Sequence, residues 1–257
     1  MSAPDPSPID GLRPPVEPTR SGGFHTTHWT AVFAAGNPAS PEAVAALESL
    51  CRTYWYPLYA YSRRQGRSPA DAEDLTQQFF ATFLESNSFA AATPERGRFR
   101  NYLLASFKNF LTNEHHRRMT AKRGGRFAFV SLDDTELETH FQNEPSDRTT
   151  PEQHYDHAFA MTLLAKVARD LKAEYDAVGK SEAFATLQVF LTSSRDDEGY
   201  QSIGASLGIS ESAVKMAVLR LRRRYGQLLR REIAQTLNDP CGIEDELRHL
   251  LEAITRK

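Results

Sequence analysis

Between Glu211 and Glu232 the sequence carries seven basic side chains and no acidic one. Such cations can neutralise phosphates, and arginine can also bind a guanine edge through two hydrogen bonds. The run is therefore typical of a surface that binds a polyanion such as DNA, although a solvated helix face can have the same composition. The seven are Lys215, Arg220, Arg222, Arg223, Arg224, Arg230 and Arg231.

Helical spacing separates these cations from the apolar residues of the same stretch. At about 100° per residue one narrow apolar stripe appears, and every basic residue falls outside it. We expect the stripe to seat the helix on its domain, and Arg222 to Arg231 to meet phosphate or solvent. The stripe consists of Val214, Val218, Leu221, Tyr225 and Leu228.

The residues before this helix predict a helix-turn-helix. Ser210 is a favourable N-cap, and Glu211 suits the positive end of the helix dipole. The segment 199–207 has helical spacing and Gly208 closes it. In this motif the start of the second helix enters the DNA major groove. We therefore expect contacts with DNA from Ser212, Ala213, Lys215 and Met216, with Leu219 and Arg220 one turn on, and from Arg223.

A second basic block covers residues 96–126, where Glu114 is the only acid. Its predicted helix, 99–118, buries Leu103, Phe107 and Phe110 on one side. The opposite side carries amide, hydroxyl, imidazole and ammonium groups, which suit phosphates and base edges. The candidates on this polar face are Asn101, Lys108, Asn109, Thr112, His115 and His116, continued by Arg117.

An acidic block separates the two basic ones, and this explains a net charge of only -2. Residues 133–156 hold eight acids and a single arginine, Arg148. Residues 126–157 also contain few apolar side chains apart from RFAFVSL. We expect this segment to be a mostly extended acidic linker.

The elements that must position these groups are all helical. No alternating strand pattern of useful length occurs, so we predict an all-α protein with two small helical domains joined by the linker. The expected boundaries are a disordered Pro-rich leader (1–23), a first domain (24–125), the linker (126–157), a helix-turn-helix domain (158–237) and a C-terminal amphipathic helix (238–257). We expect that last helix to pack on the second domain, the alternative being a regulatory or partner element.

Composition limits the class of protein. No apolar run approaches the roughly 18 residues that a membrane span requires. Cys51 and Cys241 are the only cysteines, so we expect no disulfide framework and a reducing cytoplasm. A metal-dependent enzyme would have to use the pairs His25/His28 and His154/His157, but neither pair has a partner cysteine or an HExxH frame. We expect neither catalysis nor a cofactor.

The stretch DAEDLTQQFFATFLE, 71–85, predicts a helix that starts at Ser68-Pro69. Its apolar residues form two strips about 100° apart, with Phe80 and Leu84 in the second. Two interpretations stay open. Both strips face one wide core, or the second strip meets a protein partner.

Three stretches together resemble RNA polymerase sigma factors. DAEDLTQQFFATFLE and RFRNYLLASFKNFLTNEHHRR resemble region 2 of the sigma-70 family, and YQSIGASLGISESAVKMAVLRLRRRYGQLL resembles region 4. With two domains and no long insert, the chain looks like the extracytoplasmic-function (ECF) group. Met216-Ala217 departs from the Ser-Arg of many members.

The resemblance implies a role for each block. Core RNA polymerase and promoter DNA would be the partners, with an anti-sigma protein left open. The helix over 71–85 would dock on core polymerase, and the loop 86–98 would help capture an unstacked −10 base. The polar face of 99–118 would meet the −10 element, the helix-turn-helix would read the −35 element, and the acidic linker would thread through the polymerase. The docking residues would be Asp71, Asp74, Leu75, Gln77 and Phe80. A conventional helix-turn-helix regulator with an unrelated sensing domain is the alternative, but it leaves the basic block 96–126 unexplained.

Overall fold

The computed structural model describes residues 41–85, 98–120, 134–142, 150–192, 197–237 and 240–255. Within these ranges every regular element is a helix and no strand occurs, which confirms the all-α prediction. None of the described helices combines the length and the apolar composition needed to cross a membrane. The expected leader and nearly all of the loop 86–98 lie outside the described residues.

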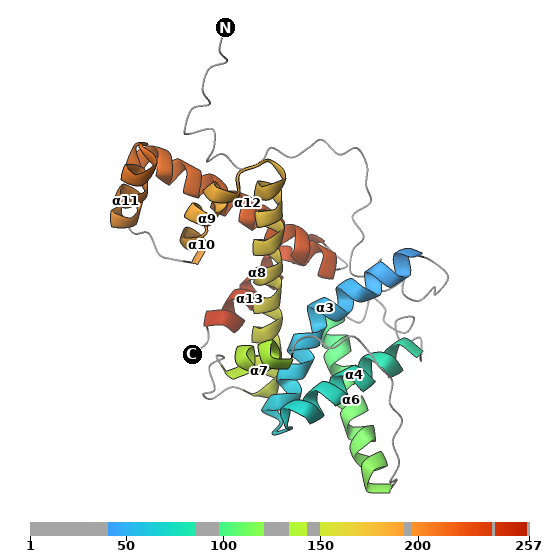
Figure 1. Cartoon of the computed structure of the whole chain (residues 1–257). Coiled ribbons are helices and arrows are strands. Elements are labelled where there is room, and N and C mark those ends of the chain that lie inside the picture. The colour runs from blue at the N-terminus through green and yellow to red at the C-terminus, as the bar shows by residue number, and fades with distance from the viewer. Residues whose placement is uncertain are drawn as a thin grey trace. The chain divides into compact units, whose positions relative to one another are not determined.

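Figure 1 labels the helices. They are α3 (Pro41–Arg64), α4 (Pro69–Glu85), α6 (Phe99–Thr120), α7 (Asp134–Gln142), α8 (Pro151–Ala177), α9 (Ser181–Leu187), α10 (Val189–Thr192), α11 (Asp197–Leu207), α12 (Glu211–Thr236), the 3₁₀ turn η2 (Pro240–Gly242) and α13 (Ile243–Thr255).

The chain forms two compact units. We call residues 25–163 with 233–257 the bundle unit, and residues 164–232 the helix-turn-helix unit. The division falls inside α8, a few residues after the expected domain start at 158. Because α13 belongs to the bundle unit, the expectation that it packs on the second domain is wrong.

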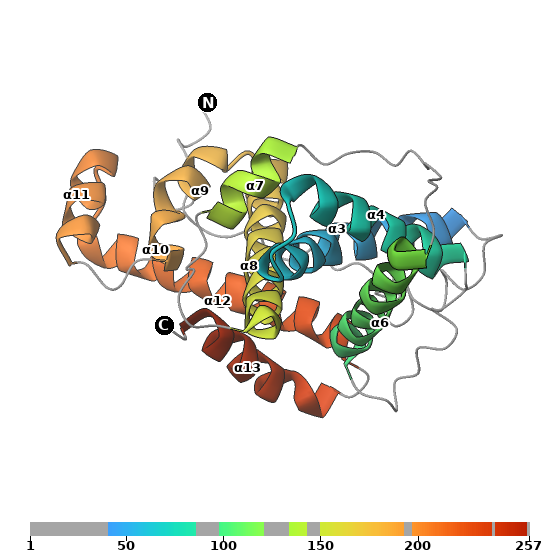
Figure 2. The ribbon, with the colours of Figure 1, turned by 90° about the horizontal axis from the view of Figure 1, so that it is seen from below.

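Aromatic side chains fill the core between α3, α4 and α6, which pack together in the bundle unit (Figures 1 and 2). The ring centroids of Tyr54 and Phe99 are 5.5 Å apart, and those of Phe79 and Phe107 are 5.0 Å apart. Pro57 lies inside α3, which is nevertheless one uninterrupted helical segment.

Helix α4 begins where the sequence predicts. The Ser68 hydroxyl oxygen accepts a hydrogen bond from the Asp71 backbone N–H at 3.1 Å, and the hydroxyl donates to the Asp71 carboxylate at 2.8 Å. Pro69 occupies the first helical position, where a missing N–H costs nothing. These local interactions explain why a helix starts here before any tertiary contact is considered.

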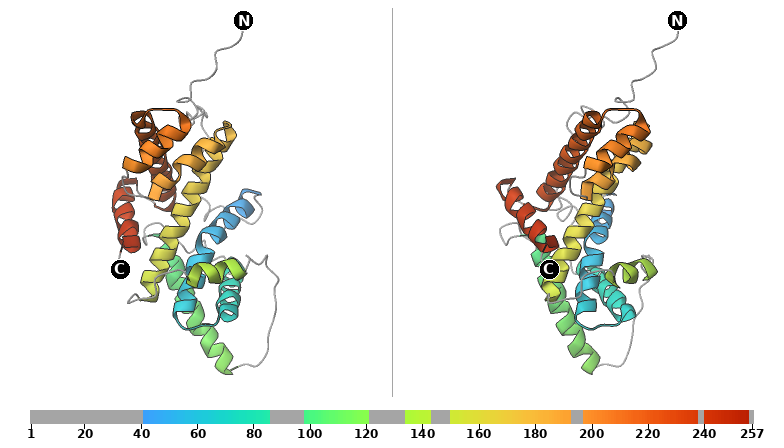
Figure 3. Two further views of the ribbon diagram at one scale, coloured as in Figure 1. Left: turned by 60° about the vertical axis from the view of Figure 1, so that its left-hand side comes forward. Right: turned by 90° about the vertical axis from the view of Figure 1, so that its left-hand side faces the viewer.

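The segment 126–157 is not mostly extended in its described part. Residues 134–142 form α7, which lies against α3 (Figure 3), and α8 already begins at Pro151. That start is a capping box: the Gln153 N–H donates to the Thr150 hydroxyl oxygen at 3.3 Å, and the Thr150 N–H donates to the Gln153 side chain at 2.9 Å. The sequence Thr-Pro-Glu-Gln at 150–153 is the signal for this helix start. The prediction of an extended linker relied instead on the low apolar content of the segment.

Within the helix-turn-helix unit, aromatic contacts join successive helices. Tyr175 of α8 meets Phe184 of α9 at a centroid distance of 5.6 Å, and Phe190 of α10 stacks on Tyr200 of α11 at 4.7 Å. Gln188 separates α9 from α10.

Candidate nucleic-acid interfaces

A tight turn joins α11 to α12. Gly208 has a φ of +64°, a conformation that favours glycine, and the Ile209 N–H donates to the Gly204 carbonyl at 3.0 Å. Ser210 caps α12 by accepting a hydrogen bond from the Ala213 N–H on its hydroxyl at 3.3 Å. A Cβ on Gly204 would lie 2.9 Å from the Ile209 carbonyl oxygen, so α11 and the turn approach too closely for any other residue. The predicted helix, glycine turn and capped helix are all present.

The inner side of α12 matches the predicted apolar stripe. Val214, Val218 and Leu221 are fully buried, while Tyr225 is half-buried and donates its hydroxyl hydrogen to the Leu164 carbonyl at 3.1 Å. Ala217 is buried as well, which makes the stripe wider than predicted. The helix is therefore held along one side, and the other side is left to solvent.

The predicted recognition residues share the outer side of α12. Ser212, Lys215, Met216 and Arg223 are exposed, and Ala213 and Arg220 are partly exposed. The Lys215 ammonium lies 2.5 Å from Glu211 Oε1 and 5.6 Å from the centre of the Tyr200 ring. The cation is thus positioned by its own unit, and a DNA phosphate would compete with Glu211 for it.

Two of the later arginines turn inward instead of outward. Arg224 donates from Nε and Nη2 to the two carboxylate oxygens of Glu174, at 2.9 and 2.7 Å. Arg222 Nε donates to the Phe190 carbonyl at 2.8 Å. The prediction that all of Arg222–Arg231 meets phosphate or solvent is therefore wrong for these two. Phe190 lies 32 positions from Arg222, and Glu174 lies 50 positions from Arg224. The helical spacing within α12 cannot show partners that lie so far away in the sequence.

The polar face predicted on α6 is exposed. Leu103 and Phe107 are buried on one side, and the predicted DNA-facing residues with described side chains lie on the other. The Thr112 hydroxyl donates to the Lys108 carbonyl at 3.0 Å, so its hydrogen is used within the helix. The exposed residues are Asn101, Lys108, Asn109, Thr112, His115 and His116; the Arg117 side chain lies outside the described residues.

An acidic side chain of α8 pairs with the cation at the centre of this face. Lys108 Nζ donates to Glu152 Oε1 at 2.6 Å, and about half of each side chain remains exposed, 46% and 44%. The hydrogen bond raises the pKa of Lys108 and lowers that of Glu152, so each partner favours the charged form of the other. Part of the acidic block therefore lies against the basic helix of its own unit.

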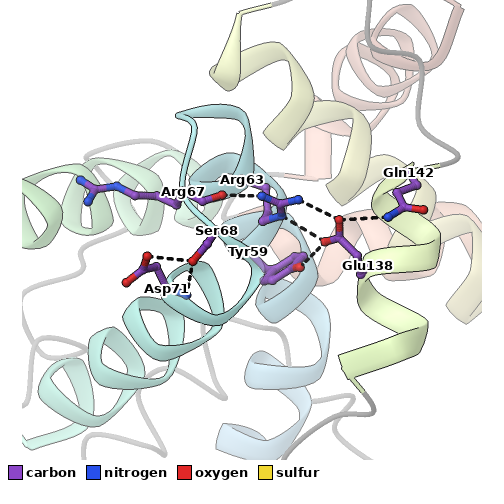
Figure 4. Close-up of polar contacts among 7 residues, drawn as sticks. All are labelled: Tyr59, Arg63, Arg67, Ser68, Asp71, Glu138 and Gln142. Carbon is purple, nitrogen blue, oxygen red and sulfur yellow. Dashed lines mark hydrogen bonds and ion pairs between the residues drawn. The ribbon is translucent and has the colours of Figure 1, made fainter.

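Helix α7 is fixed to α3 in the same manner (Figure 4). Glu138 accepts hydrogen bonds from Arg63 Nε and Nη2 at 3.1 and 2.7 Å, and from the Tyr59 hydroxyl at 2.7 Å. The hydrogen bond from Arg63 is the largest of the effects that lower the pKa of the Glu138 carboxyl. This bidentate geometry explains why a segment with few apolar residues is ordered.

Helix α13 is attached to the start of α6 by buried charge. Glu246 is 1% exposed, with its carboxylate 2.8 Å from Arg98 Nε and 3.3 Å from Arg100 Nε. Arg100, itself buried, also donates to Asp156 at 3.0 Å, and His249 lies 3.4 Å from the same carboxylate. Arg100 therefore serves the packing of the bundle unit and not a surface.

The docking residues implied on α4 divide into exposed and buried sets. Asp74 is exposed, and Asp71 and Gln77 are partly exposed. Leu75 and Phe80 are each only 2% exposed, and the Phe80 ring stacks on Trp55 at 5.6 Å. The sequence pattern left open whether the second apolar strip of this helix faces the core or a protein partner. For Phe80 the strip faces the core. A partner could touch Leu75 and Phe80 only if this core opened.

Of the histidine pair of α8, His154 is buried in the bundle unit and His157 is partly exposed. Burial, and next the Arg64 guanidinium, lower the pKa of His154 to about 4; burial, and next His140, lower the pKa of His157. Among the described residues no three His, Cys, Asp or Glu side chains are grouped so that they could hold a metal ion. His25 and His28 lie outside those residues.

Comparisons of the chain with protein-family models, with curated proteins and with solved structures found no match.

Proposed function

We propose that the protein is a sigma factor of the ECF group, which binds core RNA polymerase and directs promoter recognition, DNA melting and transcription initiation. The observation that carries the proposal is the capped helix-turn-helix of α11 and α12, with its cationic outer side. In such a motif the start of the second helix reads the major groove while nearby cations hold the phosphates.

The bundle unit supplies the second half of the proposal. The exposed amides and imidazoles on α6 suit an opened −10 element, because single-stranded bases offer edges that such groups can bind. On α4 the polymerase contact is assigned to Asp71, Asp74 and Gln77, and Leu75 and Phe80 hold the helix in place from the core. Such a subunit catalyses no reaction itself and works in the cytoplasm; Cys51 and Cys241 are not joined by a disulfide.

The ion pair between Lys108 and Glu152 gives this acid of the acidic block a role at the proposed −10 face, where it occupies the Lys108 ammonium until DNA binds. In the proposed complex a −10 phosphate takes the place of Glu152 at the Lys108 ammonium. An exposed pair of this kind is worth about 0.5 kcal/mol, so its loss is a small cost that DNA binding can offset.

Run-off transcription with bacterial core polymerase and genomic fragments tests the proposal. We expect the chain to bind core polymerase and to select new start sites. A chain that neither binds core polymerase nor alters start sites would refute it. Tight sequence-specific binding to duplex DNA without polymerase would instead support a conventional helix-turn-helix regulator.

Two matched variants test the −10 face. Lys108→Ala should weaken binding of the holoenzyme to a −10 DNA probe and reduce its salt dependence, because one phosphate contact is lost. Glu152→Gln should leave the fold intact and strengthen binding about twofold, because the competing carboxylate is removed. If both variants bind like the parent chain at low salt, Lys108 is not at the DNA interface.

A further inference from the structure

The outer side of α12 carries two large apolar side chains that its own unit does not cover. Met216 is 47% exposed and Leu219 is 58% exposed, while Ala217 and Val218 between them are buried at 1% and 2%. The inner side of α12 is therefore well packed on its unit, and poor packing does not explain the exposure of Met216 and Leu219. Residues three apart lie on one face of a helix with their Cβ atoms about 5–6 Å apart, so Met216 and Leu219 form one apolar surface.

Polar and cationic groups surround this apolar pair. At about 100° per residue, Lys215 and Arg220 lie roughly 70° to either side of its centre. Ser212 precedes the pair by one turn and Arg223 follows it by one turn, both exposed and on the same line of the helix. An apolar centre between two cationic flanks is complementary to a surface with apolar groups in its floor and anions along its edges.

The DNA major groove is such a surface. Phosphates run along both of its edges, and the C5-methyl group of thymine is the apolar group exposed on its floor. Methionine and leucine have no strong hydrogen-bonding group with which to read the donor and acceptor code of the bases. What they can detect in the groove is therefore the thymine methyl group and the shape around it.

Resting on the proposed function, we propose that Met216 and Leu219 read thymine methyl groups in the −35 major groove, and so give the protein a preference for T·A pairs there. Because the two side chains are one helical turn apart along α12, their targets lie on neighbouring base pairs. Many members of the sigma family that this chain resembles have Ser-Arg where this chain has Met216-Ala217. In this chain the bases at that point would then be recognised by apolar contact and not by hydrogen bonds. Ala217, being buried, takes no part.

The test begins with selection of duplexes from a random library by the full chain, alone and with core polymerase. Each thymine of the selected −35 site is then replaced by deoxyuridine, which removes only the methyl group. At one or two adjacent positions we expect an affinity loss of about fourfold each, the equivalent of ~0.8 kcal/mol for one buried methyl group.

Three variants assign that loss. Met216→Ala and Leu219→Ala should each lose the discrimination between thymine and uracil at one position and retain it at the other. Val189→Ala should retain both, because Val189 is a comparably exposed apolar residue, at 55%, on another helix of the same unit. All three substitutions are at the surface, and equal thermal stability would confirm that the fold is unchanged.

The outcomes separate this inference from the proposed function. Selection of a defined site with no sensitivity to uracil at any position would overturn the thymine readout and leave the sigma factor proposal standing. Loss of core polymerase binding in Met216→Ala and Leu219→Ala, with DNA selectivity unchanged, would identify the pair as a protein-docking surface and would also overturn it. A chain that selects no DNA in either form overturns both.

Discussion

Replacement of Glu246 by alanine should destabilise the bundle unit by about 3 kcal/mol, because it leaves buried positive charge without its partner. Glu246 is 1% exposed and lies between Arg98, 32% exposed, and Arg100, 3% exposed. Removal of one partner from a buried ion pair costs about 3–5 kcal/mol. We expect the lower end, since Arg100 keeps Asp156, Arg98 is partly solvated, and Glu246 Oε2 and Arg100 Nε make no hydrogen bond.

Urea unfolding followed by tryptophan fluorescence measures this change. The chain has two tryptophans, so in a Trp29→Phe background Trp55, buried in the bundle unit, is the sole reporter. Asp245→Ala is the matched control. It is the neighbouring acid on α13, but its pair with Arg248 is 70% and 69% exposed, so its loss should cost at most about 0.5 kcal/mol. If the two variants differ by less than about 1 kcal/mol, buried charge does not hold α13 in place.

Three further perturbations test other parts of the structure. Gly204→Ala should destabilise the helix-turn-helix unit by about 1–3 kcal/mol through the clash with the Ile209 carbonyl, whereas Gly226→Ala, facing only the flexible Arg230 side chain, should stabilise it by up to about 1 kcal/mol. Urea titrations that rank the two variants the other way would exclude the close contact at the turn. Phe80→Ala should cost about 3–5 kcal/mol and alter Trp55 fluorescence, while Asp74→Ala should cost less than about 0.5 kcal/mol; a stable Phe80→Ala variant would show that Phe80 is not a core residue. Because burial and the positive charge of Arg64 lower the pKa of His154 to about 4, the unfolded chain binds more protons than the folded one between about pH 6.5 and 4. The free energy of unfolding should therefore fall as pH decreases across this range, and His154→Gln should flatten that dependence; equal slopes for both proteins would contradict the assignment.

Local sequence signals predicted the local structure well. The starts of α4 and α12 depend on a cap within three residues, and the turn at Gly208 depends on a conformation that glycine favours. The apolar stripe of α12 was visible as a period of 3.6 residues. In each case the decisive interaction is between residues that are close in sequence, so a pattern in the sequence can report it.

Partners distant in sequence were not predictable in the same way. The pairs Arg63–Glu138, Arg100–Glu246 and Arg224–Glu174 join residues 50 or more positions apart. Nothing in the periodicity of one helix shows which carboxylate its arginine will meet. For this reason the sequence pattern predicted a linker for the acidic segment and a binding surface for the arginines that face inward.

These distant pairs also change what the charge pattern means. A basic–acidic–basic order suggests three separate electrostatic roles, but three acids of the acidic block, Glu138, Glu152 and Asp156, pair with cations of their own unit. A count of charges along the chain therefore overestimates the cations available to DNA. Within a face, what matters is whether each cation is held by a buried carboxylate, as Arg100 is, or by an exposed one, as Lys108 is. Only the second kind can be transferred to a phosphate at low cost, because its carboxylate returns to water without burial of an unpaired charge. By that criterion the described side chains of α6 offer one exchangeable cation, Lys108, among neutral polar groups, while those of α12 include Lys215, Arg220 and Arg223. Of these described side chains, we expect the α12 set to provide more of the electrostatic affinity.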